Sequence, residues 1–200
     1  MSNIIIIGSG GHSLSSISII ESLSTFNIRG IIDNRKKLSS KSNYPLIGND
    51  SDLEELRKKI NYAFVGIGQI KNFEPRLKAF NLLKSLDYNL PCIIAPSAII
   101  TDKNLIEEST IIMHSAIIGP KVHIGYNSII NTSAIIEHGS KIGNNSHIST
   151  GTIINGDVKI GNNTFIGSGS VIREGVSIGS QSFIKMGSIV TKDIGDNEQI

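Results

Sequence analysis

Residues 124–143 read IGYNSIINTSAIIEHGSKIG, and isoleucine recurs in them at every sixth position. The same step runs without an insertion from Ile94 to Ile184 and ends at Val190, which gives seventeen hexads. Small or β-branched side chains stand at most positions four residues after each isoleucine, and Asn104 is the clear exception. A period of six differs from the helical period of 3.6. Because six is even, residues one period apart point to the same side of a strand, so the pattern predicts short strands joined by corners.

The hexads predict a parallel β-helix over residues 93–200. Six-residue repeats of this kind build one triangular coil from three hexads, and each coil stacks on the next. Seventeen hexads therefore make between five and six coils. We expect the repeated isoleucines to fill the interior of the prism, while the small residues let the chain turn at its corners.

Residues 1–92 follow a different pattern, in which short apolar runs alternate with predicted helices. The runs at 4–7, 30–32 and 62–65 predict buried parallel strands. Helices are predicted from residue 14 to Ser24, near 52–59 with a cap at Asp50, Ser51 or Asp52, and over 75–86. The alternation indicates a small Rossmann-like α/β domain in front of the prism.

Composition excludes several classes of partner. With 19 basic and 17 acidic side chains the formal charge is +2, and because no Lys/Arg-rich stripe is present we expect no nucleic-acid partner. The single cysteine, Cys92, excludes an intrachain disulfide and is typical of a reducing compartment. No signal-peptide pattern and no run approaching a membrane span is found, so the protein is predicted to be cytoplasmic, without a membrane partner.

The segment after the first predicted strand, Gly8-Ser9-Gly10-Gly11-His12, suits an anion. A glycine-rich turn into a helix offers free amides and the positive end of the helix dipole, which would fit a phosphate of a nucleotide-sugar. A tight turn also needs glycines for purely structural reasons. Ser13 interrupts the G-x-G-x-x-G fingerprint of NAD sites, and Asp33 ends the second predicted strand, where it could contact a ribose or base.

Four histidines lie in the repeat, at positions 114, 123, 138 and 147. One coil takes eighteen residues, so two side chains stack directly only when their numbers differ by a multiple of eighteen. The six separations are 9, 15, 24, 9, 24 and 33. This spacing argues against a zinc site within one chain, and no metal is predicted.

His138 occupies the third place of its hexad, outside the isoleucine-filled interior. Pro120 and Gly156 stand in the same column one coil away on either side, which leaves room for a substrate. An imidazole there suits general-base work in acyl transfer, and a backbone amide near Gly156 is a candidate donor to the oxyanion. A purely structural histidine, hydrogen-bonded at a corner, is the alternative.

The Ile-Gly runs 124–128 and 160–164 resemble those of the hexapeptide-repeat acyltransferases, which implies a left-handed β-helix and a homotrimer. The Gly-Gly-His loop in front of a prism is similar to that of sugar acetyltransferases, which include sialic acid O-acetyltransferases of the NeuD type and UDP-4-amino-sugar N-acetyltransferases. The resemblance implies that the first domain holds a sugar or nucleotide-sugar. The positions that carry this implied role are Ser9, Gly10, Gly11, His12, Asp33, Asn34, Gly66 and Gly68.

The segment 131–138, with Asn131, Thr132, Glu137 and His138, resembles the catalytic segment of this family. The resemblance implies that His138 is the general base, and that acetyl-CoA lies against the prism between neighbouring subunits. The implied coenzyme contacts are Asn131, His147, Gly156, Ser168 and Met186.

Two departures from the family pattern affect the prediction. The N-acetyltransferases follow their base with an acidic residue, and here Gly139 stands in that place, so Glu137 is the candidate replacement. The Glu-His-Gly order resembles the NeuD type. Relatives also continue past the last coil with a Gly-x-Pro-Ala segment that this sequence lacks, so we expect weaker CoA binding.

Three readings follow from the sequence. The first is acetyl-CoA-dependent O-acetylation of sialic acid or CMP-sialic acid for a surface glycan, and the second is N-acetylation of a UDP-4-amino-sugar. A non-catalytic trimeric scaffold of a sugar-biosynthetic complex is the third, because the missing carboxylate and terminal segment would also fit a degenerate site.

Overall fold

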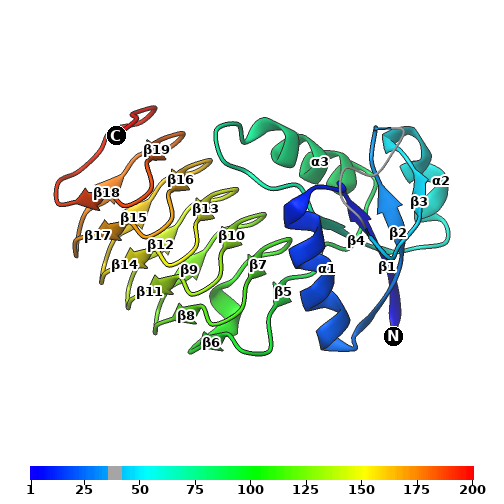
Figure 1. Cartoon of the computed structure of the whole chain (residues 1–200), viewed down its shortest axis with the longest axis horizontal. Helices are drawn as coiled ribbons and strands as arrows, with labels where there is room; N and C mark the ends of the chain where they lie inside the picture. Colours follow the sequence, from blue (N-terminus) through cyan, green and yellow to red (C-terminus); the bar gives the residue numbers. More distant parts are fainter. Residues whose placement is uncertain (36–41) are drawn as a thin grey trace. The chain divides into compact units, whose positions relative to one another are not determined.

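The computed structural model describes residues 1–35 and 42–200 (Figure 1). The chain folds into two compact units. The first unit contains residues 1–68 and 74–93, and the second contains residues 69–73 and 94–200. Residues 69–73 thus belong to the second unit, although the chain returns to the first unit at residue 74 before the prism begins.

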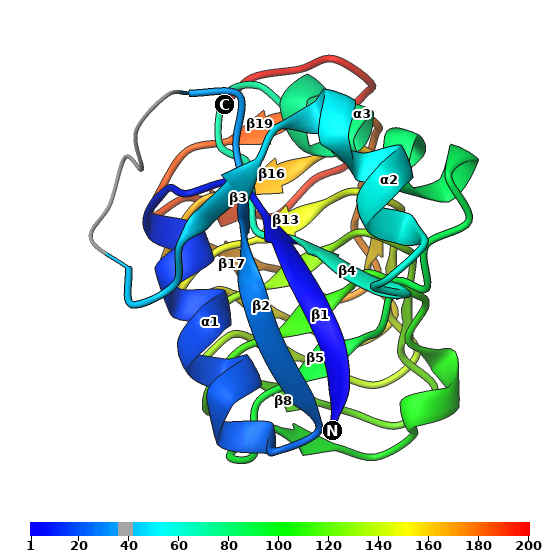
Figure 2. The same ribbon diagram turned by 90° about the vertical axis from the view of Figure 1, so that its right-hand side faces the viewer.

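The first unit is built on a parallel four-stranded sheet in the order β3-β2-β1-β4. Its strands are β1 (Ser2–Ile7), β2 (Phe26–Ile32), β3 (Leu46–Gly48) and β4 (Tyr62–Val65). Figure 2 shows β1 and β2 running side by side, and their register pairs Ile6 with Ile31. Three of these strands contain the runs that the sequence predicted, whereas β3 was missed.

The helices of this unit are α1 (Gly11–Leu23), α2 (Leu53–Arg57) and α3 (Glu74–Ser85). The prediction for the start of α1 was three residues late, because the helix already begins within the glycine-rich segment. The short 3-10 helix η1 (Asp50–Asp52) precedes α2. The N-cap of η1 is Asn49, which forms a capping box with Asp52. The N-cap of α2 is Asp52, one of the three predicted candidates, although its side chain makes no capping hydrogen bond.

The centre of the sheet explains the apolar run at the start of the chain. Ile4, Ile5 and Ile6 each have 0% of their surface exposed. β1 pairs with β2 on one edge and β4 on the other, and its successive residues 4–7 are all buried, so both faces are covered and no alternation with polar residues is needed. This buried strand fixes the position of the glycine-rich segment that follows it.

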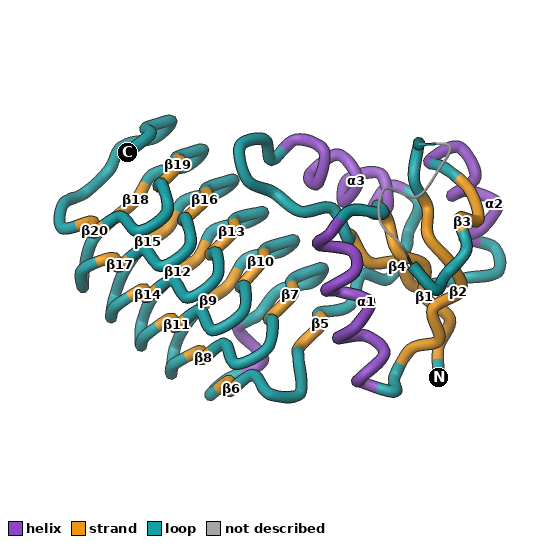
Figure 3. Tube along the Cα trace, in the orientation of Figure 1, coloured by secondary structure: helices purple, strands orange, loops and turns teal. Residues whose placement is uncertain are grey.

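The second unit is the predicted parallel β-helix (Figure 3). Its strands are two residues long and are β5 (Ile93–Ile94), β6 (Ile99–Ile100), β7 (Ile111–Ile112), β8 (Ile117–Ile118), β9 (His123–Ile124), β10 (Ile129–Ile130), β11 (Ile135–Ile136), β12 (Lys141–Ile142), β13 (His147–Ile148), β14 (Ile153–Ile154), β15 (Lys159–Ile160), β16 (Phe165–Ile166), β17 (Val171–Ile172), β18 (Ser177–Ile178), β19 (Phe183–Ile184) and β20 (Ile189–Val190). A short 3-10 helix, η2 (Lys103–Leu105), replaces one strand in the first coil.

The strands stack with a register of eighteen residues. Ile130 pairs with Ile112 below it and with Ile148 above it. The repeated isoleucines are buried, with 0% exposure at Ile130, Ile136 and Ile148. They therefore form the interior of the prism, as the period of six predicted.

The three outer faces of the prism differ in chemistry. The outward residues of β6, β8, β11, β14, β17 and β20 form the apolar face: Ile99, Ile117, Ile135, Ile153, Val171 and Ile189. The outward residues of β9, β12, β15 and β18 form the polar face: His123, Lys141, Lys159 and Ser177. The third, aromatic face ends in His147, Phe165 and Phe183, where His147 meets Phe165 edge-on and Phe165 stacks on Phe183.

A ladder of side-chain amides holds one corner of the prism. Asn127 donates from Nδ2 to Oδ1 of Asn145 at 2.8 Å, and Asn145 donates in the same way to Asn163 at 2.8 Å. All three residues have a positive φ, a conformation that asparagine tolerates better than most residues. Asn127 and Asn145 are 0% and 1% exposed, so these hydrogen bonds replace lost hydration.

No helix in the described part of the chain is long and apolar enough to cross a membrane.

Candidate active site

The loop after β1 is shaped by its glycines. Gly8 has a φ of 95°, and a Cβ atom there would lie 2.7 Å from Cγ1 of Ile67, so a side chain does not fit. A Cβ at Gly10 or Gly11 would meet nothing within 4 Å. Gly10 is the N-cap of α1 and makes no side-chain capping hydrogen bond, and the N-terminus of a helix attracts an anion through its dipole.

Asp33 lies next to this loop at the end of β2. Its Oδ2 accepts a hydrogen bond from the Ser9 hydroxyl at 2.7 Å, and Arg35 donates to both carboxylate oxygens. The hydrogen bonds from Arg35, and then that from Ser9, hold the pKa of the Asp33 carboxyl well below its usual range against the opposing effect of desolvation. Asp33 is therefore a fixed negative charge beside the glycine-rich loop.

Asn34 is oriented by Asp50. Its Nδ2 donates to the Asp50 carboxylate at 2.8 Å, and its Oδ1 accepts from the Asp50 backbone N–H at 3.1 Å. Asp33, Asn34 and Asp50 line a cavity of about 180 Å³ together with Gly8, Ile67 and Lys78. The cavity brings two predicted residues together with two, Asp50 and Lys78, that sequence reasoning missed.

The loop after β4 closes the other side of the glycine-rich segment. A Cβ at Gly66 would crowd Ile6 and Ser13, and a Cβ at Gly68 would lie 3.1 Å from Cβ of His12. The two predicted glycines thus allow this loop to approach the start of α1 closely. His12 is half-buried beside Gly68 and is not among the residues that line the cavity.

A buried arginine donates hydrogen bonds to the loop that follows β4. Arg76 on α3 has 0% exposure and donates from Nη1 to the carbonyls of Val65 and Ile67 at 2.7 and 2.8 Å. Burial lowers the pKa of its guanidinium to about 9. Sequence reasoning missed Arg76, because an arginine in a predicted helix usually faces solvent.

In the prism, the His138 imidazole packs against Gly156 of the next coil. A Cβ at position 156 would stand 2.6 Å from Nε2 of His138 and 2.5 Å from Cε1. Gly156 itself is buried, while His138 is exposed. Within the described residues no side chain or backbone group hydrogen-bonds the ring, so it is available to a ligand. Gly156 therefore provides space for the ring. Glu137, which precedes His138 in the chain, is also exposed.

Asn131 and His147 form a second cluster. The Nδ1 atom of His147 lies 2.5 Å from the Gln69 carbonyl, which can only accept, so this nitrogen carries the proton. Its Nε2 lies 3.1 Å from Nδ2 of Asn131, whose Oδ1 accepts from the Thr132 backbone N–H. His147 is 6% exposed, and both of its ring nitrogens have a partner.

Segment 69–73 joins this cluster through Gln69. Its Nε2 donates to the Asn145 carbonyl at 2.9 Å, and the residue is 2% exposed. Nothing in the local sequence pattern predicts this contact, because the partners are 76 residues apart.

Ser168 and Met186 continue the same edge toward the last coil. The Ser168 hydroxyl lies 2.8 Å from that of Ser149. Met186 is 78% exposed. Like Asn131, both residues follow strands of the aromatic face and precede strands of the apolar face.

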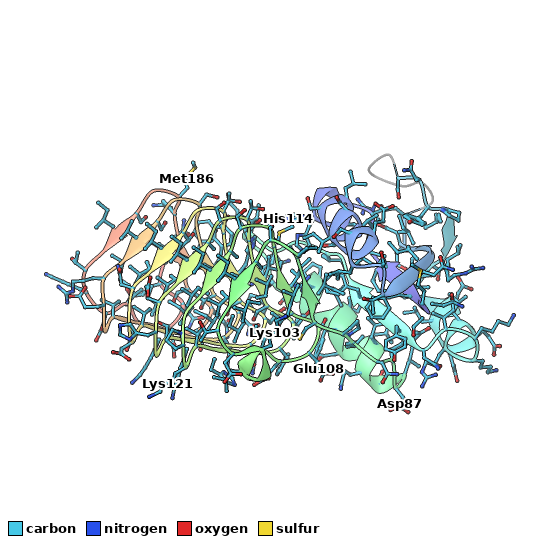
Figure 4. The ribbon with its side chains drawn as sticks, turned by 90° about the horizontal axis from the view of Figure 1, so that it is seen from below. Asp87, Lys103, Glu108, His114, Lys121 and Met186 are labelled. Atoms are coloured by element: carbon cyan, nitrogen blue, oxygen red, sulfur yellow. The ribbon has the colours of Figure 1, made fainter. Side chains whose placement is uncertain are left out.

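The predicted site residues of the prism therefore lie on two opposite edges of the apolar face. Asn131, Ser168 and Met186 are at the corner before its strands, whereas Glu137, His138 and Gly156 are at the corner after them. Figure 4 shows this separation, because His114 and Met186 mark the first edge and Lys121 marks the second. A full face of the prism separates the two groups within one chain.

The remaining histidines of the prism have partners of their own. His114 lies 2.8 Å from the Ser97 hydroxyl, and His123 lies 3.0 Å from the Glu107 carboxylate. Among the described residues no group of three or more His, Cys, Asp or Glu side chains could hold a metal ion.

Comparison with protein families finds two matches in different parts of the chain. Residues 3–81 match the family described as PglD N-terminal domain. Residues 115–155 and 157–192 match the hexapeptide repeat of succinyl-transferase. A comparison with curated protein sequences finds no match.

Several solved structures share the fold over nearly the whole chain. The acetyltransferase domain of PglB from Neisseria gonorrhoeae FA1090, in complex with acetyl coenzyme A, is 25% identical with a TM-score of 0.90, over 98% of this chain and 94% of that one. PerB from Caulobacter crescentus, in complex with CoA and GDP-perosamine, is 26% identical with a TM-score of 0.89, over 98% and 92%. A histidine-to-alanine mutant of GDP-perosamine N-acetyl transferase from the same organism is 25% identical with a TM-score of 0.91, over 100% and 93%.

The family matches and the shared fold agree on the order of the two units. An α/β unit of the PglD type precedes a left-handed parallel β-helix of hexapeptide repeats. These matches fit the hexapeptide-repeat acetyltransferases that modify sugars.

Proposed function

We propose that the protein transfers the acetyl group of acetyl-CoA to a nucleotide-linked sugar in glycan biosynthesis, in the cytoplasm. Residues 1–92 would hold the acceptor and residues 93–200 would carry out the transfer. The proposal is carried by the exposed imidazole of His138 in the second unit, together with the presence in the first unit of a cavity lined by Asp33. The solved relatives, which bind acetyl-CoA, CoA and GDP-perosamine, support the same substrate classes.

The chemistry assigns a role to His138. The amine or hydroxyl of the acceptor attacks the thioester carbonyl, and an imidazole nitrogen takes the proton that the acceptor loses. The C–S bond then breaks, CoA leaves as the thiolate and receives a proton, and the acetyl group stays on the sugar. A nitrogen that makes no hydrogen bond within the described residues suits this role.

We infer that the acceptor is held by the first unit through its nucleotide. The positive end of the α1 dipole would bind a phosphate of the nucleotide, with Ser9, Gly10, Gly11 and His12 around it. Asp33 and Asn34 would contact the ribose or base, while Gly66 and Gly68 let the neighbouring loop approach. Free sialic acid has a carboxylate but no phosphate, ribose or base, so it could make only part of these contacts, and a nucleotide-linked acceptor is favoured.

The coenzyme would lie along the other edge of the apolar face. The Asn131 amide has one N–H beyond its contact with His147, and this donor suits the thioester carbonyl oxygen. Ser168 and the exposed Met186 would then contact the rest of acetyl-CoA. His147 would act here by orienting Asn131.

A homotrimer would bring the two edges together. The apolar face exposes Ile99 and Ile189 to 64% and 77%, so a further copy is a suitable partner for it. When three apolar faces pack about a three-fold axis, the edge after the face in one copy meets the edge before it in the next. Each site would then combine His138 of one copy with Asn131 of a neighbour.

Amine and hydroxyl acceptors are the two candidates. An amine is supported by the relatives that act on GDP-perosamine, a sugar named in two of the compared structures. Acetylation of a sialic acid hydroxyl is supported by the order Glu137-His138-Gly139 and by the exposed base, on which a hydroxyl depends more strongly.

The experiment is a thiol-release assay with acetyl-CoA and four acceptors: a GDP-4-amino-sugar, a UDP-4-amino-sugar, CMP-sialic acid and free sialic acid. We expect turnover with a nucleotide-linked acceptor and its loss in His138→Ala. Turnover only with free sialic acid would contradict the nucleotide assignment. Release of no thiol with any acceptor would favour the non-catalytic scaffold.

A further inference from the structure

A stacked pair of dipeptides surrounds the His138 ring. His138-Gly139 lies directly below Gly156-Asp157, and the Asp157 backbone N–H donates to the His138 carbonyl at 2.9 Å. The His138 ring fills the space left by Gly156. In the same way the Asp157 carboxylate fills the space left by Gly139, since a Cβ at position 139 would stand 3.2 Å from Cγ of Asp157 and still closer to its Oδ1.

This exchange places a carboxylate over Gly139, the residue that follows His138. Position 139 cannot carry a side chain while Asp157 keeps this conformation. The carboxylate at this corner therefore comes from Asp157 of the following coil and not from position 139. Asp157 is exposed, and its carboxylate makes no hydrogen bond within the described residues. The side chain is therefore free to turn from Gly139 toward the ring.

A general base of this kind needs a partner for its second nitrogen. A carboxylate that accepts a hydrogen bond from one imidazole nitrogen fixes the tautomer, so the other nitrogen presents its lone pair. We propose that Asp157 is the positioning residue of His138. It accepts a hydrogen bond from the imidazole when an acceptor sugar occupies the corner. This inference rests on the proposed role of His138 as the base.

The other carboxylates of this corner are less well placed. Glu137 precedes the turn at residues 138–139, and its side chain is not among the nearest atoms that a Cβ at Gly139 or Gly156 would meet. Glu174 stands in the column of His138 but two coils away, with Gly156 between them. Of the carboxylates in the described residues, that of Asp157 is the one that lies against Gly139.

The test compares Asp157→Asn with the control Glu174→Gln, which changes a neighbouring carboxylate in the same way. We expect kcat to fall at least about tenfold in Asp157→Asn, with the KM values for acetyl-CoA and acceptor unchanged. Glu174→Gln is expected to keep the wild-type kcat. Thermal melting of each variant shows whether the fold is retained.

A swap variant separates positioning from packing. Asp157→Gly alone should lose kcat, and Gly139→Asp combined with Asp157→Gly should recover most of it, because the carboxylate returns to the same corner from the coil below. The positive φ of 69° at position 139 is tolerated by aspartate better than by most residues.

The outcomes are distinguishable. Wild-type kcat in Asp157→Asn, or a loss in Glu174→Gln that matches it, would overturn the assignment of Asp157. No recovery in the swap variant, with its melting temperature intact, would overturn it as well. Full activity in His138→Ala would instead remove the proposed function on which the inference rests.

Discussion

The imidazole of His138 occupies the space that a side chain at position 156 would need, because a methyl group on Gly156 would stand 2.6 Å from Nε2 of the ring. The absence of a side chain in one coil therefore determines where the candidate base lies in the coil below. This relationship links residues eighteen positions apart, and it gives the first prediction.

Gly156→Ala should displace the imidazole without unfolding the prism. The added methyl group cannot fit beside the ring in its present position, and the ring is exposed and able to move outward. We expect kcat for acetyl transfer to fall at least about tenfold with little change in melting temperature. Unaltered kcat in this variant would mean that the observed position of the ring does not matter for catalysis.

A charge on the apolar face should disrupt the proposed trimer. Ile117→Asp and Ile153→Asp each place a carboxylate at the centre of this face, where burial against another copy would be costly. We expect sedimentation velocity to show monomers, with loss of activity. Ser177→Asp makes a similar change on the polar face and should leave the trimer assembled. Trimers in all three variants would contradict the assignment of the face.

Sharing of the site between copies has its own test. His138→Ala and Asn131→Ala chains should each be inactive alone, yet trimers formed by co-expressing them should regain activity. Random assembly at equal amounts would place an intact His138 next to an intact Asn131 in roughly a quarter of the sites. Mixed trimers that stay inactive would show that the two residues do not combine across copies.

The ion pair of Asp33 should make stability depend on pH in the acid range. Its hydrogen bonds from Arg35 and Ser9 depress the pKa in the folded state, so the stabilisation is present above the unfolded value of about 3.9 and is lost as pH falls below it. Between about pH 5 and pH 3, urea unfolding should show a larger loss of stability in the wild type than in Asp33→Asn. Equal losses would indicate that the pair contributes nothing.

Removing one rung of the asparagine ladder should destabilise the prism. Asn145→Gly keeps the positive φ available, but leaves Nδ2 of Asn127 and Oδ1 of Asn163 without their partner, at a cost of about 1–3 kcal/mol. Ser115→Gly changes an exposed corner residue of the same conformation and should cost less than about 0.5 kcal/mol. Chemical denaturation measures both, and equal effects would contradict a role for the ladder.

The prism was predictable because its interior repeats the same chemistry in every coil. A run of isoleucines at a constant step indicates both the strands and their register, and the structure confirms these from β7 onward. In contrast, β3 (Leu46–Gly48) is only three residues long, and its run is too short to stand out. Sequence reasoning therefore missed the element that brings Asp50 to the cavity.

The geometry of the candidate site was predictable only where the resemblance to a family segment and the eighteen-residue column identified the same residue. His138 and Gly156 were placed in one column from their numbers, and the structure confirms that the ring and the glycine are in contact. The same arithmetic also pairs Gly139 with Asp157, although that pairing was not considered. Arg76 and Gln69 could not be found in this way, because a buried arginine on a helix and a contact across 76 residues leave no local pattern.

The eighteen-residue register has a consequence for how such an enzyme can change. Residues that share a site are neighbours along the axis of the prism, so a functional group can pass from one coil to the next while the backbone stays the same. Variants are therefore best designed as pairs of residues whose numbers differ by eighteen. A side chain that is lost in one coil can then be supplied from the adjacent coil.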